Sequence, residues 1–261
     1  MSILERSKAV RTPVLPEVLD VVSKVPVDFD SVKQYKTNIV QWLKPIIDLK
    51  DYYVYPTNGI TQGLDWWMSN EQKSIWMEDG DYQWVQQSGS MYSDSIKYIS
   101  TPSAIDGNYR PIPTYTPSVL DLAYVGSTAM CAPLEINNNV ETVFYSLSKP
   151  FGIRNIRTGW MFTKTPDPRM DALIHNAKYY NYYANDVAES IISNFDIDYI
   201  HNTLRNHQHS VCTTLDFVPS DSVWLATTTD PVYDKFKRGD CNRVCIAEEV
   251  SAAYSQSART H

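Results

Sequence analysis

A lysine, two serines, an arginine and two glycines share one short segment in the middle of the chain. In order they are Ser146, Ser148, Lys149, Gly152, Arg157 and Gly159. A lysine amine can condense with a carbonyl group, and the imine formed can exchange with the amine of a substrate. Serine hydroxyls and a guanidinium group can bind a phosphate dianion, the guanidinium through two parallel hydrogen bonds. The segment therefore predicts covalent chemistry at Lys149 beside a bound phosphate.

Two further motifs lie where predicted strands end. The segment Tyr55–Leu64 runs from a strand through a glycine turn into a helix. Such a turn presents backbone N–H groups and the positive end of the helix to an anion. Upstream of the lysine, Asp121 and Tyr124 belong to the apolar run Val119–Tyr124. Successive side chains of a strand point to opposite faces, so positions 121 and 124 would point in opposite directions within a strand. Both can reach one ligand only where the strand ends and the chain turns.

These motifs resemble those of the fold-type I pyridoxal 5′-phosphate (PLP) enzymes, the aspartate aminotransferase superfamily. The resemblance spans roughly Tyr52 to Ala247, although its specific motifs fill only part of that range. It implies that Lys149 holds PLP as a Schiff base and then moves a proton as general acid and base. It also implies amino acid and 2-oxo acid substrates, and a homodimer with active sites at its interface.

The same resemblance assigns the phosphate of the cofactor to two clusters. One consists of backbone groups and a hydroxyl at the glycine turn, and the other consists of hydroxyls and a guanidinium in the lysine segment. In chain order their members are Gly59, Ile60, Thr61, Ser146, Ser148 and Arg157.

Three more residues are expected around the cofactor ring. A buried Asp121 beside the ring nitrogen would keep that nitrogen protonated and so make the ring an electron sink. The resemblance implies that Tyr124 bonds the phenolic oxygen of the cofactor. It also implies an aromatic side chain stacked on the ring, for which we choose Tyr82, with Trp84 as the alternative.

The segment Asn242–Ala247 resembles the strand that carries the substrate-binding arginine of amino-acid aminotransferases. Arg243 would grip the α-carboxylate and fix which bond of the substrate breaks. One position departs from the superfamily pattern, because its usual asparagine is replaced by Ala104, or by Ser103 if the register moves by one. Loss of this donor is expected to raise the basicity of the imine and to leave Tyr124 as its main partner.

Transamination is the reaction we expect, and two alternatives stay open. Decarboxylation, racemisation and β- or γ-elimination, including C–S lysis, use the same lysine. The short chain and the absent asparagine also leave a non-catalytic relative open, against which the intact Lys149, Asp121 and Arg157 argue. No metal site is expected, because no acid or cysteine is spaced to complete one with His207 and His209.

The elements predicted around these motifs alternate between strands and helices. Strands are expected at 52–55, 73–77, 97–99, 119–124, 142–146 and 160–163, and a helix at 31–49. This alternation predicts a three-layer α/β sandwich with a mostly parallel central sheet and ligands at the carboxyl ends of the strands. The resemblance implies that this sandwich is a PLP-dependent transferase-like large domain.

Three regions divide the chain in this interpretation. Residues 1–30 are expected to form an extended N-terminal arm, because Pro13, Pro16 and Pro26 interrupt them. Residues 31–166 would form the PLP-binding large domain. Residues 167–261 would begin with a long helix at 169–195, continue with a helix at about 197–207, and complete a small α+β domain with strands at 223–226 and 243–247.

Composition limits the class of protein. The 261 residues have a net charge of −7, which argues against nucleic acid as the main partner. The 4 cysteines form no CxxC pair, and no apolar run approaches the length of a membrane span. The first residues mix charges and prolines where a secretory signal needs an apolar core. We therefore expect a cytoplasmic protein with reduced thiols and no membrane partner.

Overall fold

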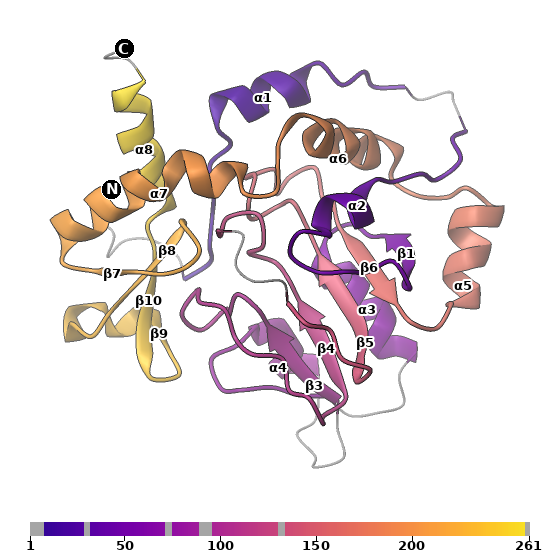
Figure 1. Cartoon of the computed structure of the whole chain (residues 1–261), viewed down its shortest axis with the longest axis horizontal. Helices are drawn as coiled ribbons and strands as arrows, with labels where there is room; N and C mark the ends of the chain where they lie inside the picture. The colour runs from indigo at the N-terminus through magenta and orange to yellow at the C-terminus, as the bar shows by residue number, and fades with distance from the viewer. Residues whose placement is uncertain (1–7, 29–31, 71–74, 89–95, 130–133, 259–261) are drawn as a thin grey trace.

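A six-stranded sheet forms the centre of the molecule, and a four-stranded sheet lies beside it (Figure 1). The computed structural model describes residues 8–28, 32–70, 75–88, 96–129 and 134–258. The larger sheet has the order β1-β6-β5-β4-β3-β2 and the smaller one has the order β7-β8-β10-β9.

The larger sheet and its helices occupy the first two thirds of the chain, and the elements of the smaller sheet follow. Their bounds are α1 Pro16–Ser23, α2 Ile39–Leu43, β1 Tyr53–Pro56, α3 Ile60–Asn70, β2 Ile75–Trp76, α4 Gln83–Ser88, β3 Ile96–Ser100, β4 Ser118–Asp121, β5 Val140–Tyr145, β6 Trp160–Thr163, α5 Pro168–Met170, a π-helical turn Asp171–Asn176, α6 Tyr182–Asn194, α7 Tyr199–Leu215, β7 Val218–Pro219, β8 Leu225–Thr228, a 3-10 helix Pro231–Phe236, β9 Lys237–Arg238, β10 Cys241–Cys245 and α8 Ala247–Ser257.

Strands β2, β3, β4 and β5 are parallel to one another, and β6 runs antiparallel between β5 and β1. All four residues of β4 are buried, as expected of a parallel strand covered on both faces. The mostly parallel sheet predicted from the sequence is thus confirmed. The strand predicted at 119–124 ends early, at Asp121, because the backbone N–H of Ala123 turns back to the Asp121 carboxylate.

Helices cover both faces of this sheet, so that the sheet is the middle one of three layers. Phe144 of β5 meets Trp67 of α3 edge to face, with ring centroids 6.5 Å apart. The next residue, Tyr145, points to the opposite face and lies 6.0 Å from the ring of Trp42 in α2. Because successive strand residues point to opposite faces, α3 and α2 lie on opposite sides of the sheet.

The N-terminal arm is only partly extended, so the prediction of an arm without packed elements is wrong. Pro16 begins α1, where its missing N–H and fixed φ suit the first turn of a helix. Val18 and Val22 of α1 are buried, and α1 packs against α6 (Figure 1). Residues 8–15 do remain outside any helix or strand.

Two predicted helices are also wrong in extent. The helix expected at 31–49 is present only as α2, since Pro45 removes the next backbone donor and residues 32–38 form no helix. The helix expected at 169–195 is broken before α6, where Lys178 has a left-handed φ of 55°. Asn181 then accepts a hydrogen bond from the backbone N–H of Ala184 and starts α6 anew.

The small α+β unit is built on β7, β8, β10 and β9, all antiparallel to their neighbours. Helices α7 and α8 pack against each other over it (Figure 1). The helix α7 is longer than predicted, and the strand predicted at 223–226 lies at Leu225–Thr228. Within the described ranges no helix combines the length and the apolarity needed to cross a bilayer.

Candidate active site

The carboxyl ends of β1, β3, β4 and β5 open onto one cavity of about 610 Å³, which the small unit and the N-terminal arm complete. Every residue that the sequence predicted for the site lines this cavity. These residues are Gly59, Ile60, Thr61, Tyr82, Asp121, Tyr124, Ser146, Ser148, Lys149, Arg157 and Arg243. They come from five separate segments of the chain.

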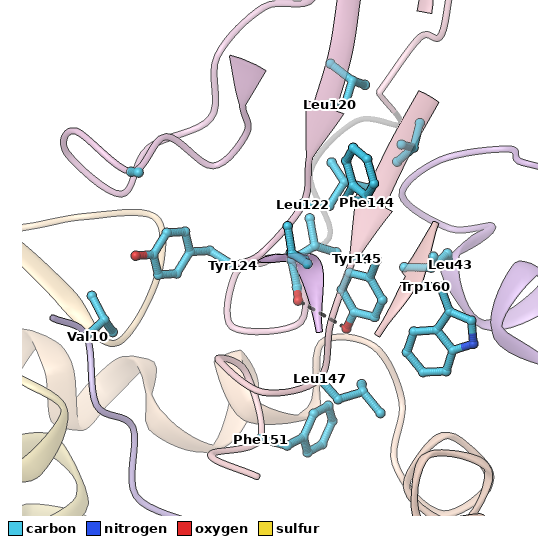
Figure 2. Packing of buried hydrophobic residues seen from close by; sticks show 14 of the residues in the cluster. Val10, Leu43, Leu120, Leu122, Tyr124, Phe144, Tyr145, Leu147, Phe151 and Trp160 are labelled. Carbon is cyan, nitrogen blue, oxygen red and sulfur yellow. Dashed lines mark hydrogen bonds between the residues drawn. The ribbon is translucent and has the colours of Figure 1, made fainter. Parts of the chain in front are cut away.

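Lys149 follows β5 in a turn fixed by buried apolar side chains. Leu147 and Phe151 on either side of it are 0% and 1% exposed and anchor the turn in the core (Figure 2). The Lys149 amine donates a hydrogen bond of 2.9 Å to the backbone oxygen of Val10, on the N-terminal arm. Burial, and then the positive charge of Arg243, lower the pKa of Lys149 to about 8.

Asp121 is the last residue of β4 and is buried beneath the cavity. Its Oδ2 accepts a hydrogen bond of 2.5 Å from the Tyr98 hydroxyl, and its Oδ1 accepts one of 2.7 Å from the N–H of Ala123. Burial raises the pKa of Asp121 to about 6, whereas these two hydrogen bonds lower it. A cation brought to this carboxylate would therefore stabilise its charged form.

The turn before α3 forms one end of the cavity together with Arg157. Gly59 has a φ of 87°, and a Cβ there would lie 2.7 Å from Nη2 of Arg157. Arg157 itself is exposed, has a left-handed φ of 64°, and donates a hydrogen bond of 2.9 Å to the Asn58 backbone oxygen. Its guanidinium thus lies against the N-terminus of α3, where an anion would meet both a charge and free N–H groups.

Gly159 allows the lysine segment to approach the backbone of Gly59 closely. A Cβ on Gly159 would lie 2.7 Å from the Cα of Gly59, which is backbone and cannot move aside cheaply. The N–H of Thr57 also donates to the Gly159 oxygen at 2.8 Å. The second glycine of the lysine segment is therefore required for its close contact with the turn at Gly59.

The two serines form a hydroxyl pair in the loop before Lys149. The Ser146 hydroxyl donates to the Thr158 backbone oxygen at 2.7 Å and lies 2.9 Å from the Ser148 hydroxyl. The Ser148 N–H donates to the Ser146 oxygen at 3.1 Å. Both hydroxyls line the same cavity as Arg157.

Of the two aromatic candidates for stacking, only Tyr82 lines the cavity. Its hydroxyl lies 2.8 Å from Oγ1 of Thr61, which ties it to the first turn of α3. The Trp84 ring is directed elsewhere, since its Nε1 donates to the Asp65 carboxylate at 2.8 Å. This geometry favours Tyr82 over Trp84.

Arg243 reaches the cavity from the centre of the small sheet and is only 3% exposed. Its Nη1 donates to the Ala104 backbone oxygen at 2.7 Å and lies 3.4 Å from the Tyr124 hydroxyl. Its Nη2 donates to the backbone oxygen of Lys8 at 2.9 Å. Figure 2 shows the Tyr124 ring pointing away from Tyr145 and Phe151 and toward the side where Val10 lies.

The two residues considered for the asparagine position, Ser103 and Ala104, lie differently in the loop after β3. Ala104 lines the cavity, whereas Ser103 does not and is 2% exposed. The Ser103 hydroxyl instead accepts a hydrogen bond from the N–H of Ile105. Of the two candidate positions, Ala104 is therefore the one that faces the cavity, and its side chain has no polar group.

Several residues of the site were not predicted from the sequence. Tyr98 supports Asp121, and Arg238 from β9 lines the cavity. The N-terminal arm contributes residues 8–12, whose backbone oxygens contact the two cations Lys149 and Arg243. In the described ranges, no group of three or more His, Cys, Asp and Glu side chains could hold a metal ion.

Solved structures with this architecture are known, although no protein-family model and no curated protein matches the chain. A PLP-bound C–S lyase from Staphylococcus hominis has a TM-score of 0.69 at 10% identity, covering 97% of this chain and 90% of that one. An aminotransferase from Mycobacterium tuberculosis has a TM-score of 0.66 at 14% identity, covering 94% and 91%.

A third similar structure is histidinol-phosphate aminotransferase from Sinorhizobium meliloti in complex with PLP. Its TM-score is 0.64 at 15% identity, and the match covers 97% of this chain and 90% of that one. The chain therefore has the fold of the fold-type I PLP-dependent enzymes, as the lysine segment predicted.

Proposed function

We propose that this chain, which has the fold of the fold-type I PLP-dependent enzymes, binds PLP through Lys149 and transfers an amino group between an amino acid and a 2-oxo acid. The observation that carries the proposal is the convergence of all eleven predicted residues on one cavity. A partly buried lysine with a lowered pKa, a buried aspartate and a phosphate-binding turn are the three groups that this chemistry requires.

The residues present fit the cofactor. A phosphate would be held by Arg157, the hydroxyls of Ser146 and Ser148, and the N-terminus of α3. Asp121 is buried, and in the part of the chain that the structure describes no cation pairs with it, so a protonated ring nitrogen would suit it. PLP bound here supplies the electron sink that stabilises negative charge at the substrate Cα.

Four side chains of the protein would act on the substrate and the cofactor. The Lys149 amine, once displaced by the substrate amine, would remove the proton from the substrate Cα and deliver it to C4′ of the cofactor. Asp121 would complement the positive charge of the protonated ring nitrogen, and Tyr82 would pack against the ring. The Tyr124 hydroxyl, which lies 3.4 Å from Nη1 of Arg243, would donate a hydrogen bond to the phenolic oxygen of the cofactor.

Arg243 would orient the substrate by its α-carboxylate. Its Nη2 now donates to the Lys8 oxygen, a single backbone acceptor that a carboxylate can replace with a stronger, charge-assisted pair of bonds. Substrate binding therefore requires the arm to give way at Lys8, and the same movement would release the Val10 oxygen from Lys149.

A second candidate function is elimination at the substrate side chain, as in a C–S lyase. It is favoured by the likeness to the PLP-bound C–S lyase, and by the alanine at position 104, which alters the donors around the cofactor. Decarboxylation would use the same lysine. Which bond breaks depends on how Arg243 orients the substrate.

One experiment separates these reactions. The PLP-loaded protein is mixed with an amino acid, with and without 2-oxoglutarate, and the products are identified. Transamination without an acceptor stops after about one equivalent of 2-oxo acid per active site, and it turns over and yields glutamate only when 2-oxoglutarate is present. A lyase yields a 2-oxo acid and ammonia without an acceptor, and a decarboxylase releases carbon dioxide. A protein that binds PLP and yields none of these products would be a non-catalytic relative.

We further propose that the chain acts as a homodimer. A surface beside the phosphate turn carries large aromatic side chains, among them Trp66, Tyr180 and the 75% exposed Tyr179. Aromatic residues of this kind are common at subunit interfaces. Sedimentation equilibrium should give twice the chain mass of 29.9 kDa, and a Tyr179→Glu variant should shift the protein toward the monomer.

A further inference from the structure

The cavity has a charge opposite to that of the chain as a whole. The chain carries a net charge of −7, yet among the described residues the cavity lining holds seven basic side chains and a single acidic one, Asp121. The basic residues are Lys8, Arg11, Lys149, Arg154, Arg157, Arg238 and Arg243. Such an arrangement concentrates anions in the cavity and repels them from the rest of the surface.

The proposed reaction uses only part of this positive charge. In the proposed reaction Arg157 binds the phosphate and Arg243 binds the α-carboxylate. Lys149 is bonded covalently to the cofactor. Asp121 offsets one charge. The remaining basic side chains are without a role in binding the cofactor or an amino acid's common backbone groups. They therefore point to another anionic group in the ligand.

Arg238 is placed to bind that group. It pairs with Cys241 across the β9–β10 hairpin, and Arg243 lies two residues beyond Cys241. Because cross-strand partners and alternate residues share a face, Arg238 and Arg243 project from the same face of the small sheet. The two guanidinium groups thus enter the cavity side by side, and each lowers the pKa of the Lys149 amine.

The guanidinium of Arg238 is fixed at one nitrogen and available at the others. Its Nη1 donates to the backbone oxygens of Gly80 and Asp81, both at 3.1 Å. Its Nε and Nη2 make no hydrogen bond with any described residue, and neither is enclosed by protein. A fixed fork with two donors left over is suited to a carboxylate or a phosphate ester.

Two exposed arginines add charge around the same cavity. Arg11 lies on the arm and Arg154 lies in the loop after Lys149, and both line the cavity. Within the described ranges neither forms a hydrogen bond or an ion pair with protein. They would attract an anionic ligand, whereas Arg238, partly buried and held by backbone, would bind it.

We propose that the substrate is an amino acid whose side chain carries a second anionic group, a carboxylate or a phosphate ester, and that Arg238 binds this group. The proposal rests on the proposed function, because it takes Arg243 as the α-carboxylate site. Arg238 is a specificity-determining residue in this account.

The first test uses inert ligands and measures binding rather than turnover. Succinate and butyrate have the same carbon chain, but only succinate has a second carboxylate. Titration calorimetry with the purified protein should give a Kd for succinate roughly 10- to 100-fold below that for butyrate, the range expected for one charge-assisted contact. Equal affinity for the two acids would overturn the proposal.

Variants then assign the preference to one residue. Arg238→Gln should remove most of the advantage of succinate over butyrate and leave butyrate affinity unchanged, and Arg238→Lys should keep part of it. Lys237→Gln is the matched control, because it removes one positive charge from the same strand at an exposed position on the other face. A succinate preference that survives Arg238→Gln, or is lost in Lys237→Gln, would refute the assignment.

The second test distinguishes a carboxylate from a phosphate. L-Aspartate, L-glutamate and O-phospho-L-serine are compared with L-asparagine, L-glutamine and L-serine by their effect on the absorption of the Lys149-bound cofactor. Each anionic amino acid is paired with its neutral counterpart, and in at least one pair the anionic member should change the absorption at a lower concentration. The pair that shows this difference identifies the anionic group as a carboxylate or a phosphate ester. If no cofactor attaches, the proposed function fails. The comparison of succinate with butyrate does not depend on the cofactor, so it still tests separately whether Arg238 binds an anion.

Discussion

The hydroxyl of Tyr98 and the carboxylate of Asp121 form a hydrogen bond of 2.5 Å across two neighbouring parallel strands. Ser100 of β3 pairs with Asp121 of β4, and Tyr98 lies two residues before Ser100 on the same face. The diagonal placement brings the phenol to Oδ2. Burial raises the pKa of Asp121 to about 6, and the Tyr98 bond opposes that rise.

A pH-dependent cost to stability follows for the cofactor-free protein. Because the pKa of Asp121 is raised from 3.8 to about 6, the native state binds more protons than the unfolded state between these values. Stability should therefore fall as the pH rises through this window, by about 3 kcal/mol from this group, and then level off. The side chain in Asp121→Asn does not titrate, so the unfolding free energy of this variant should rise relative to that of the wild type as the pH rises through the same window.

Chemical denaturation at a series of pH values measures this difference in unfolding free energy. Asp240→Asn, in an exposed turn, controls for the loss of one negative charge. Tyr98→Phe should move the window to higher pH, since it removes a hydrogen bond to the ionised carboxylate. A wild-type minus Asp121→Asn difference that does not vary with pH would contradict the account of this site.

Attachment of PLP should accelerate with pH. Burial and the charge of Arg243 lower the pKa of Lys149 to about 8, so about a tenth of the side chains carry a neutral, nucleophilic amine at neutral pH. The rate constant for PLP attachment, followed by absorbance, should rise roughly tenfold for each pH unit below 8 and level off above it. A rise that continues toward the ordinary lysine pKa of 10.5 would show that Lys149 is not perturbed.

Arg157→Gln should weaken binding of PLP much more than binding of pyridoxal. The arginine lies against the turn before α3 and would face the phosphate. Loss of one charge-assisted contact should raise the apparent Kd for PLP by roughly 10- to 100-fold. Pyridoxal lacks the phosphate, so its Kd should change little. Arg169→Gln, an exposed arginine outside the cavity, serves as control. Equal losses for the two ligands would remove Arg157 from the phosphate site.

Gly159→Ala should damage both stability and cofactor binding. Its Cβ would lie 2.7 Å from the Cα of Gly59, so the turn before α3 must shift. We expect a loss of about 1–3 kcal/mol in unfolding free energy and a weaker affinity for PLP. In Gly63→Ala the Cβ meets only side-chain atoms of Phe144 and Thr57, so this variant should retain more of the affinity. Unchanged PLP affinity in Gly159→Ala would contradict the close approach described here.

The residues of the site that were predicted from the sequence belong to short local motifs. Apart from Arg243, which lies within β10, each lies at or just after the end of a strand or in a glycine turn, so its type and neighbours are enough to identify it. Lys149 and Asp121 are examples, and parallel strands bring such ends to one edge of the sheet.

The residues that sequence reasoning missed depend on contacts between distant segments. Tyr98 is an ordinary buried strand aromatic until the register of β3 and β4 places it beside Asp121. Arg238 is an isolated arginine until the β9–β10 hairpin turns it toward Arg243. The arm contributes backbone oxygens at Lys8 and Val10, and no side-chain pattern encodes those.

The helix predictions failed for local reasons that periodicity does not register. In the segment after the arm, apolar residues recur at helical spacing, yet Thr37 accepts a hydrogen bond from the N–H of Ile39 and Glu189 accepts one from that of Asn38. Those bonds start α2 late, and Pro45 ends it early. Burial of Tyr35 and Ile46 in the core explains why the apolar pattern persists outside the helix.

The central claim is that Lys149 binds PLP covalently. The most direct measurement is borohydride reduction of the PLP-treated protein, followed by proteolysis and mass spectrometry of the peptides. We predict one pyridoxyl-phosphate adduct, on the peptide containing Lys149, together with a visible absorption band that Lys149→Ala lacks. A reduced protein without an adduct at Lys149, or with the adduct spread over exposed lysines such as Lys44 and Lys50, would contradict the claim.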